Sequence, residues 1–279
     1  GYKVYGSDGC QLTDEPATEM IGYINAVDAF EVKADSFDSY VKSGLLEFAP
    51  DEITEKYLAC VASRSVGRAD GLKVCYSPLN GTGYKLVPEI LKRAGVSEIV
   101  IVPEQSMPDG NFPTCSYPNP EKPEALKLGL ELARKSGSDI LIATDPDADR
   151  IGTAVRHKGE YRLMSGNEIG VLLTDYLLSR RKENGTLPVK PVIVSTIVST
   201  SLAEKVAAEY GAEFVSVLTG FKYIGGEIAK LESKGQTERF VLGYEESYGY
   251  LSGSYVRDKD AVVASMLVAE MTAYYLKSG

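Results

Sequence analysis

Three aspartates stand at alternate positions in the stretch ATDPDADRIG, residues 143–152. Asp145, Asp147 and Asp149 directly follow the apolar run 140–143, which favours a buried strand. Carboxylates this close together repel one another unless a cation, hydrogen bonds or protonation compensates. Mg²⁺ accepts a few carboxylate oxygens and fills its remaining positions with water or phosphate oxygens. The spacing therefore predicts a magnesium site, with a solvated acidic turn as the alternative.

Two other metal or phosphate chemistries begin with a similar stretch. A calcium-binding EF-hand loop needs Gly at its sixth position and Glu at its twelfth, where this chain has Arg150 and Arg156. A phosphatase that uses Asp145 as nucleophile and Asp147 as acid is chemically reasonable. However, Asp149 and Arg150 stand where such enzymes usually carry a small hydroxyl residue. Arg150 suits a bidentate contact with phosphate, or an ion pair with the neighbouring aspartates.

Polar residues of a second stretch, GYEESYG at 243–249, suit a sugar. Glu245 and Ser247 stand two residues apart, so a carboxylate and a hydroxyl could reach vicinal sugar hydroxyls. In LTGFKYIGG, residues 218–226, Thr219 and Gly220 lie at a predicted strand-to-helix turn, where free N–H groups favour an anion. Lys222 would add positive charge there. Ordinary strand-end polar residues and an ordinary helix cap are the alternatives.

Cations also occur in RDKD, residues 257–260. Arg257 and Lys259 are interpreted either as a solvated helix start or as cations of a cleft. The single histidine, His157, lies among charged residues in a predicted hairpin and is expected at the surface, so no Ser-His-Asp arrangement can be assembled.

Apolar periodicity predicts an α/β fold made of two successive β-α-β-α-β units, with mixed, mainly parallel sheets covered by helices. The predicted strands are 72–76, 98–102, 139–144, 192–197, 213–217 and 239–242. Both acidic loops follow the last strand of their unit, and open α/β sheets bind ligands beyond the carboxyl ends of their strands. The proline-rich stretch 103–123 is long enough to be either mobile or functional.

Composition narrows the class of protein. A length of 279 residues suits two domains and part of a third. The net charge of −9 argues against nonspecific binding to nucleic acid or anionic membranes. The four cysteines form no CxxC pair, so no zinc site is indicated. No apolar stretch approaches the length of a membrane span, so we expect a cytoplasmic protein without membrane or nucleic-acid partners.

The motifs ATDPDADRIG, TGFKYIG, GYEESYG and RDKD, in this order, resemble those of the α-D-phosphohexomutases, specifically the phosphoglucomutase/phosphomannomutase group. The stretches YSPLNGTG and PDGNFPTCSYPNPEKPEAL resemble the second domain of that family. The resemblance implies an isomerase-class enzyme of four domains around a cleft. It moves a phosphoryl group between the 1- and 6-positions of a hexose phosphate, such as glucose or mannose phosphate, through a phosphoserine and a bisphosphorylated sugar, assisted by Mg²⁺.

Residue roles carried over from the resemblance fall into three groups. The metal ligands would be Asp145, Asp147 and Asp149. The catalytic residues would be Arg150, the cleft lysine Lys259, and Lys3 as a candidate general acid or base. A lysine base would need its pKa lowered towards neutrality. The substrate-binding residues would be Thr219, Gly220, Lys222, Glu245, Ser247 and Arg257.

Domain boundaries follow from the same resemblance. Residues 1–50 would be the remnant of a first domain, residues 51–160 a second domain with the metal loop, and residues 161–279 a third with the sugar loop and the start of a connection to a fourth. The serine motif would precede residue 1 and the last domain would follow residue 279, so we expect a central fragment that is inactive alone. A non-catalytic module that binds Mg²⁺ and sugar phosphate, or an aspartate-nucleophile phosphatase, is the alternative. Residues 1 to about 49 are expected to pack poorly.

Overall fold

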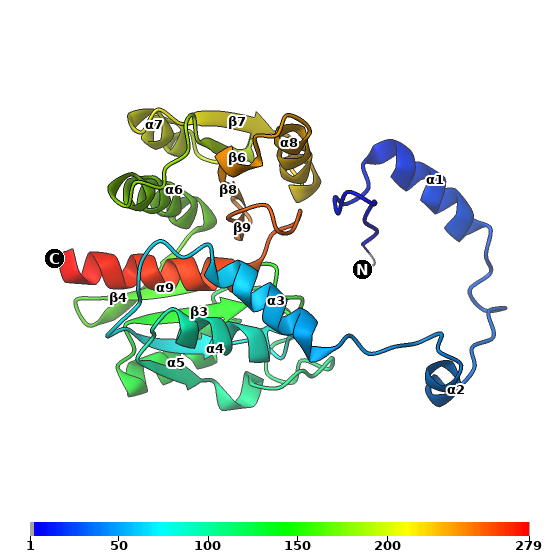
Figure 1. Ribbon diagram of the computed structural model, residues 1–279. Helices are drawn as coiled ribbons and strands as arrows, with labels where there is room; N and C mark the ends of the chain where they lie inside the picture. The colour runs from blue at the N-terminus through cyan, green and yellow to red at the C-terminus, as the bar shows by residue number, and fades with distance from the viewer. Residues whose placement is uncertain (1–2, 279) are drawn as a thin grey trace.

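The computed structural model describes residues 3–278 and contains two β-sheets flanked by helices (Figure 1). The first sheet has the strand order β2-β1-β3-β4-β5, in which β1 runs parallel to β2 and β3, while β4 and β5 are antiparallel additions. The elements of this part are α3 (Asp51–Ala62), β1 (Lys73–Ser77), α4 (Gly83–Arg93), β2 (Glu98–Ile101), the 3₁₀ helix η1 (Pro103–Gln105), α5 (Lys127–Ser136), β3 (Ile140–Thr144), β4 (Ile151–His157) and β5 (Glu160–Met164).

The second sheet has the order β7-β6-β8-β9, with β6 parallel to β7 and β8 and with β9 antiparallel. Its elements are α6 (Gly166–Glu183), β6 (Val192–Thr196), α7 (Leu202–Glu209), β7 (Glu213–Val217), α8 (Phe221–Ser233), the 3₁₀ helix η2 (Thr237–Arg239), β8 (Phe240–Glu245), β9 (Gly249–Leu251) and α9 (Ala261–Ser278). The predicted α/β class with two β-α-β-α-β units is confirmed, each unit being extended by antiparallel strands.

Alternating residues of the central strands explain how the first sheet is covered on both faces. Val74 and Ile142 belong to the core under α4 and α9, whereas Cys75 and Leu141 belong to the core under α5. All of these strand residues are fully buried, as expected for strands covered on two sides. The hairpin of β4 and β5 turns at Lys158 and Gly159, both at positive φ, and leaves His157 exposed as predicted.

Helix α9 is buried on all sides along most of its length. Every residue from Ala261 to Ala273 is buried, because the helix lies between the two halves and packs against α4, β3 and β4 of the first sheet as well as β9 of the second (Figure 1). Strand β5 of the first sheet ends at Met164, beyond the predicted domain boundary at residue 160. The chain thus returns to the first sheet after completing the second. Within residues 3–278, no helix has both the length and the apolar character needed to cross a membrane.

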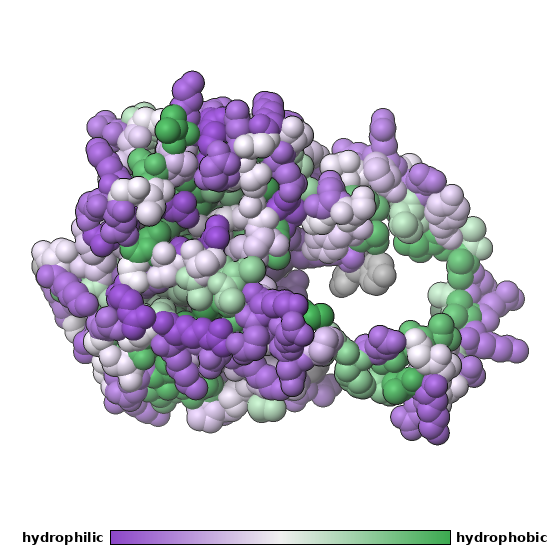
Figure 2. All heavy atoms as spheres, in the orientation of Figure 1, coloured by the Kyte–Doolittle hydropathy of each residue, from purple (hydrophilic) through white to green (hydrophobic). Residues whose placement is uncertain are grey.

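The N-terminal segment, residues 3–49, carries two helices that extend away from both sheets (Figure 1). Its helices α1 (Asp14–Asn25) and α2 (Phe37–Lys42) contain no buried residue. Apolar side chains along it are open to solvent, including Phe30, which is fully exposed (Figure 2). Residues 3–12 behave differently, since Cys10 is buried and its thiol lies 3.6 Å from the Gly225 carbonyl oxygen of α8. Within residues 3–49, the poorly packed part is therefore residues 13–49, whereas residues 3–12 contact the rest of the chain.

Candidate metal and phosphate site

The aspartates occupy the tight turn between β3 and β4. The Oδ1 atom of Asp145 accepts hydrogen bonds from the backbone N–H groups of Asp149 (3.0 Å) and Arg150 (2.9 Å), and Ala148 takes a positive φ of 55°. This geometry brings one carboxylate oxygen from each of Asp145, Asp147 and Asp149 to within 4.8 Å of one another. The turn therefore gathers three oxygen ligands that could hold one metal ion.

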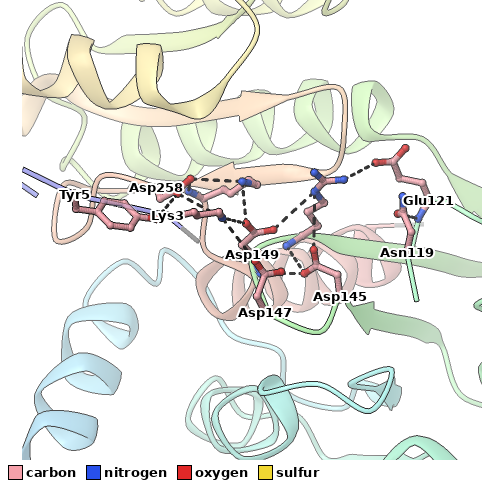
Figure 3. Close-up of polar contacts among 10 residues, drawn as sticks. Lys3, Tyr5, Asn119, Glu121, Asp145, Asp147, Asp149 and Asp258 are labelled. Atoms are coloured by element: carbon pink, nitrogen blue, oxygen red, sulfur yellow. Dashed lines mark hydrogen bonds and ion pairs between the residues drawn. The ribbon is translucent and has the colours of Figure 1, made fainter. Parts of the chain in front are cut away.

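Two lysines from distant parts of the chain meet on one of these carboxylates (Figure 3). The Oδ2 atom of Asp149 lies 2.7 Å from Lys3 Nζ and 2.8 Å from Lys259 Nζ. Lys3 also lies 3.6 Å from Asp147 and 3.8 Å from Asp258. The structure thus brings the predicted metal ligands together with Lys259 and Lys3, the two lysines for which the family resemblance implies catalytic roles.

Charge is distributed unequally over the aspartates. Burial and the neighbouring charge of Asp149 raise the pKa of Asp145 to about 8. Burial alone would also raise the pKa of Asp149, but the ammonium groups of Lys259 and Lys3 outweigh it and lower that pKa below its usual range. A raised pKa on one carboxyl group and a lowered pKa on its neighbour are the usual result when closely spaced carboxylates repel each other and only one of them is paired with cations.

Lys3 does not have the lowered pKa that a lysine general base requires. Its partial burial would lower the pKa, yet hydrogen bonding and attraction to Asp149, with smaller contributions from Asp258 and Asp147, raise it above the usual range. As placed in the structure, Lys3 is a charged partner of the aspartates. This arrangement suits a cation that contacts phosphate better than a neutral base.

Arg150 forms an ion pair with Glu121, a residue of the proline-rich loop that the sequence did not single out and that Figure 3 labels together with Asn119. Arg150 Nη1 lies 3.2 Å from Glu121 Oε1, and the backbone N–H of Glu121 donates to Asn119 Oδ1 at 2.9 Å. Arg150 Nε is buried without a hydrogen-bond partner within residues 3–278, 3.9 Å from Asp145 and 3.8 Å from Asp149. The proline-rich loop thereby contributes to the site, a function that its length alone left open.

The predicted sugar loop adjoins the aspartate turn through its backbone. Arg150 forms an isolated antiparallel bridge with Gly249, and the Ile151 N–H donates to the Tyr248 carbonyl at 3.1 Å. Glu245 is the last residue of β8, and its Oε1 accepts the Gly220 N–H at the start of α8 (3.0 Å).

Glu245 is only 5% exposed, and this burial raises its pKa although Lys259 and the Gly220 N–H oppose the shift. Ser247 is half-buried in the turn after β8, and Thr219 is exposed beside Gly220. Thr219 and Gly220 thus follow β7 and Glu245 and Ser247 lie at the end of β8, and the hydrogen bond from Gly220 to Glu245 joins these two strand ends.

Gly249 provides the space for Lys259. A Cβ atom at Gly249 would lie 2.4 Å from Lys259 Cδ, which is closer than real side chains approach. The aliphatic part of Lys259 therefore runs directly over β9 before its ammonium group reaches Asp149.

Two predicted substrate-binding cations pair with carboxylates other than the three aspartates, although Arg257 lines the same cavity as Lys3 and Asp149. Lys222 pairs with Asp14 of α1 at 2.7 Å, and Arg257 pairs with Glu232 of α8 at 2.8 Å. Neither forms an ion pair with the three aspartates in the described chain. Arg257 instead ties the 254–260 loop to α8.

A cavity of about 1050 Å³ opens beside the aspartates and is lined by Lys3, Asp147, Asp149 and the 254–260 loop. Tyr5 and Asp258, which the sequence analysis did not select, line it as well, and the Tyr5 hydroxyl donates to Asp258 Oδ2 at 2.8 Å. Asp258 lies inside the RDKD motif, so attention to its acidic residues would have found it. Tyr5 had no comparable sequence pattern.

Comparison with known families gives a match to each half of the chain. Residues 52–159 match the family description "Phosphoglucomutase/phosphomannomutase, alpha/beta/alpha domain II", and residues 165–278 match the corresponding domain III. The boundary between the two matches coincides with the end of the first sheet at Met164.

Relatives and solved structures agree with these matches. A phosphomannomutase of Mycoplasmoides pirum is 34% identical and a phosphoglucomutase of Staphylococcus saprophyticus 36% identical; each is matched over 100% of this chain and 50% of its own length. The crystal structure of a phosphoglucomutase/phosphomannomutase family protein from Burkholderia thailandensis superimposes with a TM-score of 0.63 at 21% identity, covering 80% of this chain and 44% of the other. The chain thus spans about half the length of the curated relatives it matches.

Proposed function

Because this chain belongs to the phosphoglucomutase/phosphomannomutase family of α-D-phosphohexomutases, we propose that it supplies the metal-binding and sugar-binding loops of a phosphohexomutase. The reaction is the transfer of a phosphoryl group between the 1- and 6-positions of a hexose phosphate, through a bisphosphorylated sugar. The observation that carries the proposal is the cluster of three carboxylates beside Lys3, Lys259 and Arg150.

The carboxylates fit a magnesium ion. Asp145 uses Oδ1 for two backbone N–H groups and keeps Oδ2 for a metal, while Asp147 is exposed and free to turn towards it. Asp149 engages the lysines with Oδ2, which leaves Oδ1 as its ligand atom. When bound, Mg²⁺ would supply positive charge to phosphoryl oxygens and fill its remaining positions with them or with water.

The remaining residues of the site would bind and orient the sugar phosphate. Lys259 and Arg150 offer charge-assisted hydrogen bonds to a phosphate group. Glu245 and Ser247 at the end of β8, together with Thr219 after β7, offer groups to sugar hydroxyls. A solved N-acetylphosphoglucosamine mutase of Aspergillus fumigatus was crystallised with glucose 1,6-bisphosphate; it superimposes with a TM-score of 0.52 at 19% identity, over 78% of this chain and 46% of its own. We propose a hexose bisphosphate of this kind as the ligand here.

Titration calorimetry of the purified chain with MgCl₂, and then with glucose 1,6-bisphosphate at saturating Mg²⁺, tests this function. We expect saturable binding of both. Asp147→Asn should weaken Mg²⁺ binding by roughly tenfold, because it removes a ligand charge without disturbing a buried contact. Asp35→Asn, at an exposed aspartate of the N-terminal segment, is the matched control.

Two results would count against the proposal. The first is a calorimetric titration with Mg²⁺ that gives the same affinity for wild type and Asp147→Asn. The second is hydrolysis of p-nitrophenyl phosphate that disappears in Asp145→Asn, which would favour an aspartate-nucleophile phosphatase.

A further inference from the structure

Asp260, the residue after Lys259, forms the centre of a buried polar cluster. It is 6% exposed and precedes α9, where its Oδ1 accepts the N–H groups of Val262 (2.7 Å) and Val263 (3.3 Å). Its Oδ2 accepts two phenol hydroxyls, from Tyr57 at 2.7 Å and Tyr255 at 2.6 Å. The two bonds to Oδ1 are those of an ordinary helix N-cap, whereas the two bonds from tyrosine hydroxyls to Oδ2 are additional to it.

The cluster joins segments that are distant in sequence. Tyr57 comes from α3, and Tyr255 comes from the loop before α9; their rings pack with centroids 6.2 Å apart. Because Tyr255 and Asp260 bracket residues 256–259, their hydrogen bond closes this loop on itself. The same two tyrosines line the cavity that Lys3 and Asp149 line. The cluster is therefore part of the wall of the site.

Backbone hydrogen bonds connect this cluster to the aspartate turn, residues 145–150. The N–H of Ala261 donates to the carbonyl oxygen of Ala148 at 3.0 Å, and Ala148 lies between two of the aspartates. The N–H of Asp260 donates to the Tyr250 carbonyl of β9 at 2.9 Å. The backbone that follows Lys259 is thus held by the aspartate turn and by β9, and the side chain of Lys259, 9% exposed, forms an ion pair with Asp149.

We propose that Asp260, held by Tyr57 and Tyr255, is a positioning residue that fixes Lys259 against the aspartate turn. The carboxylate does not contact the reacting groups. It sets the path of the 254–260 loop and the start of α9, so that the Lys259 ammonium group lies 2.8 Å from Asp149 and 3.5 Å from Asp258 and can reach a phosphate placed beside them. Only the identity of that phosphate rests on the proposed function; the positioning of Lys259 does not.

Lysine labelling gives a direct readout of this position. The folded chain is treated briefly with a trace of acetic anhydride, and the acetylation of each lysine is measured by peptide mass spectrometry. In Tyr57→Phe/Tyr255→Phe we expect Lys259 to be labelled about fivefold faster or more, as expected when hydrogen bonds to a charged group are lost. Lys73, paired with Glu98 at the opposite end of β1, should keep its wild-type rate and serve as internal reference.

The chain offers a matched control for the loss of two phenol donors. Asp175 on α6 also accepts two tyrosine hydroxyls, from Tyr210 at 2.7 Å and Tyr275 at 3.0 Å. Tyr210→Phe/Tyr275→Phe removes two equivalent hydrogen bonds at a carboxylate outside the site, so the labelling rate of Lys259 should stay unchanged. If the Tyr57→Phe/Tyr255→Phe variant folds poorly, the single variant Tyr57→Phe is measured instead, with Tyr210→Phe as its control.

Wild-type labelling of Lys259 in a folded Tyr57 and Tyr255 variant would overturn the proposal, whatever its thermal stability. Affinity for glucose 1,6-bisphosphate, which we expect to fall about threefold to tenfold in the same variant, is the second readout. If the wild-type chain binds no bisphosphate, the proposed function fails, and the labelling rates still decide whether Asp260 positions Lys259.

Discussion

Lys259 and Asp149 form the ion pair that joins the two halves of the site, with 2.8 Å between Nζ and Oδ2. Lys259 belongs to the loop that follows the second sheet, whereas Asp149 belongs to the turn that follows β3 of the first. A single contact therefore depends on how both sheets and α9 are assembled. It also places a positive charge next to a carboxylate that we propose as a metal ligand.

Replacing Lys259 should change the affinities for metal and phosphate in opposite directions. Lys259→Met removes one positive charge next to the proposed metal position, so we expect Mg²⁺ to bind roughly tenfold more tightly. The same change removes a charge-assisted hydrogen-bond donor, so glucose 1,6-bisphosphate should bind roughly tenfold more weakly. Calorimetry of both ligands measures this, with Lys73→Met as control. Affinities that fall together would show that Lys259 maintains the turn and does not contribute charge to phosphate binding.

Gly249 gives a second test of the same contact. In Gly249→Ala the new Cβ would lie 2.4 Å from Lys259 Cδ, so the lysine must move away from its path over β9. We expect a loss of about 1–2 kcal/mol in the free energy of unfolding and weaker bisphosphate binding. Gly226→Ala is the control, because nothing lies within 4 Å of a Cβ there and alanine favours a helix. Urea denaturation of both variants checks the difference, and equal stability would contradict the close approach.

The arrangement of strands, helices and the aspartate turn could be predicted from sequence because each depends on local pattern. The apolar run before Asp145 is completely buried in β3, and the capping box of Ser165 and Glu168 opens α6 as its sequence indicates. The predicted strands also place the aspartate turn and the sugar loop at strand ends. In the structure, the bridge between Arg150 and Gly249 joins these two segments.

Pairings between long side chains from distant segments could not be predicted. Lys222 and Arg257 lie in motifs that suit a cleft, yet Lys222 pairs with Asp14 of α1 and Arg257 pairs with Glu232 of α8. Glu121 reaches Arg150 from a loop without periodicity. Spacing along the chain fixes which face of an element a residue occupies, but it does not fix the partner that a flexible charged side chain meets.

Burial of a carboxylate in α9 should make stability depend on pH. Glu270 is fully buried; its Oε2 accepts the N–H groups of Val66 and Gly67, both at 3.1 Å, and its Oε1 has no hydrogen-bond partner within residues 3–278. Burial raises the pKa of Glu270, and its hydrogen bonds only partly oppose the shift. The folded state therefore binds the proton more tightly than the unfolded state does.

The sign follows from that difference in proton binding. As pH rises above about 4.3, the unfolded chain loses the proton first, so stability falls until the raised pKa of the folded state is passed. Glu270→Gln lacks this titration. We expect its free energy of unfolding, relative to wild type, to rise between pH 4 and pH 7 with a slope of up to about 1.4 kcal/mol per pH unit. Urea denaturation at several pH values measures this, and Glu131→Gln on the surface of α5 is the control. Parallel profiles for Glu270→Gln and wild type would contradict the assignment.

Residues 13–49 should be the least protected part of the described chain. Neither α1 nor α2 contains a buried residue, so little burial opposes local opening. Residues 3–12 instead form the bridge of Tyr5 and Gln11 and contact Asp149 through Lys3. Amide exchange should accordingly be fast in residues 26–36 and slower in residues 4–12.

Limited trypsin digestion of the folded chain checks this difference at single sites. Lys33 and Lys42 are exposed in the unprotected segment, whereas Arg134 and Lys135 are equally exposed but lie in α5 against the first sheet. We expect cleavage first at Lys33 or Lys42, because a protease needs an open backbone as well as an accessible side chain. After cleavage, the peptide that contains Lys3 should be released on dilution, and Asp149 would lose one of its two ammonium partners. Cleavage after Arg134 that precedes cleavage at Lys33 and Lys42, or strong amide protection throughout residues 13–49, would contradict the prediction that this segment is the least protected.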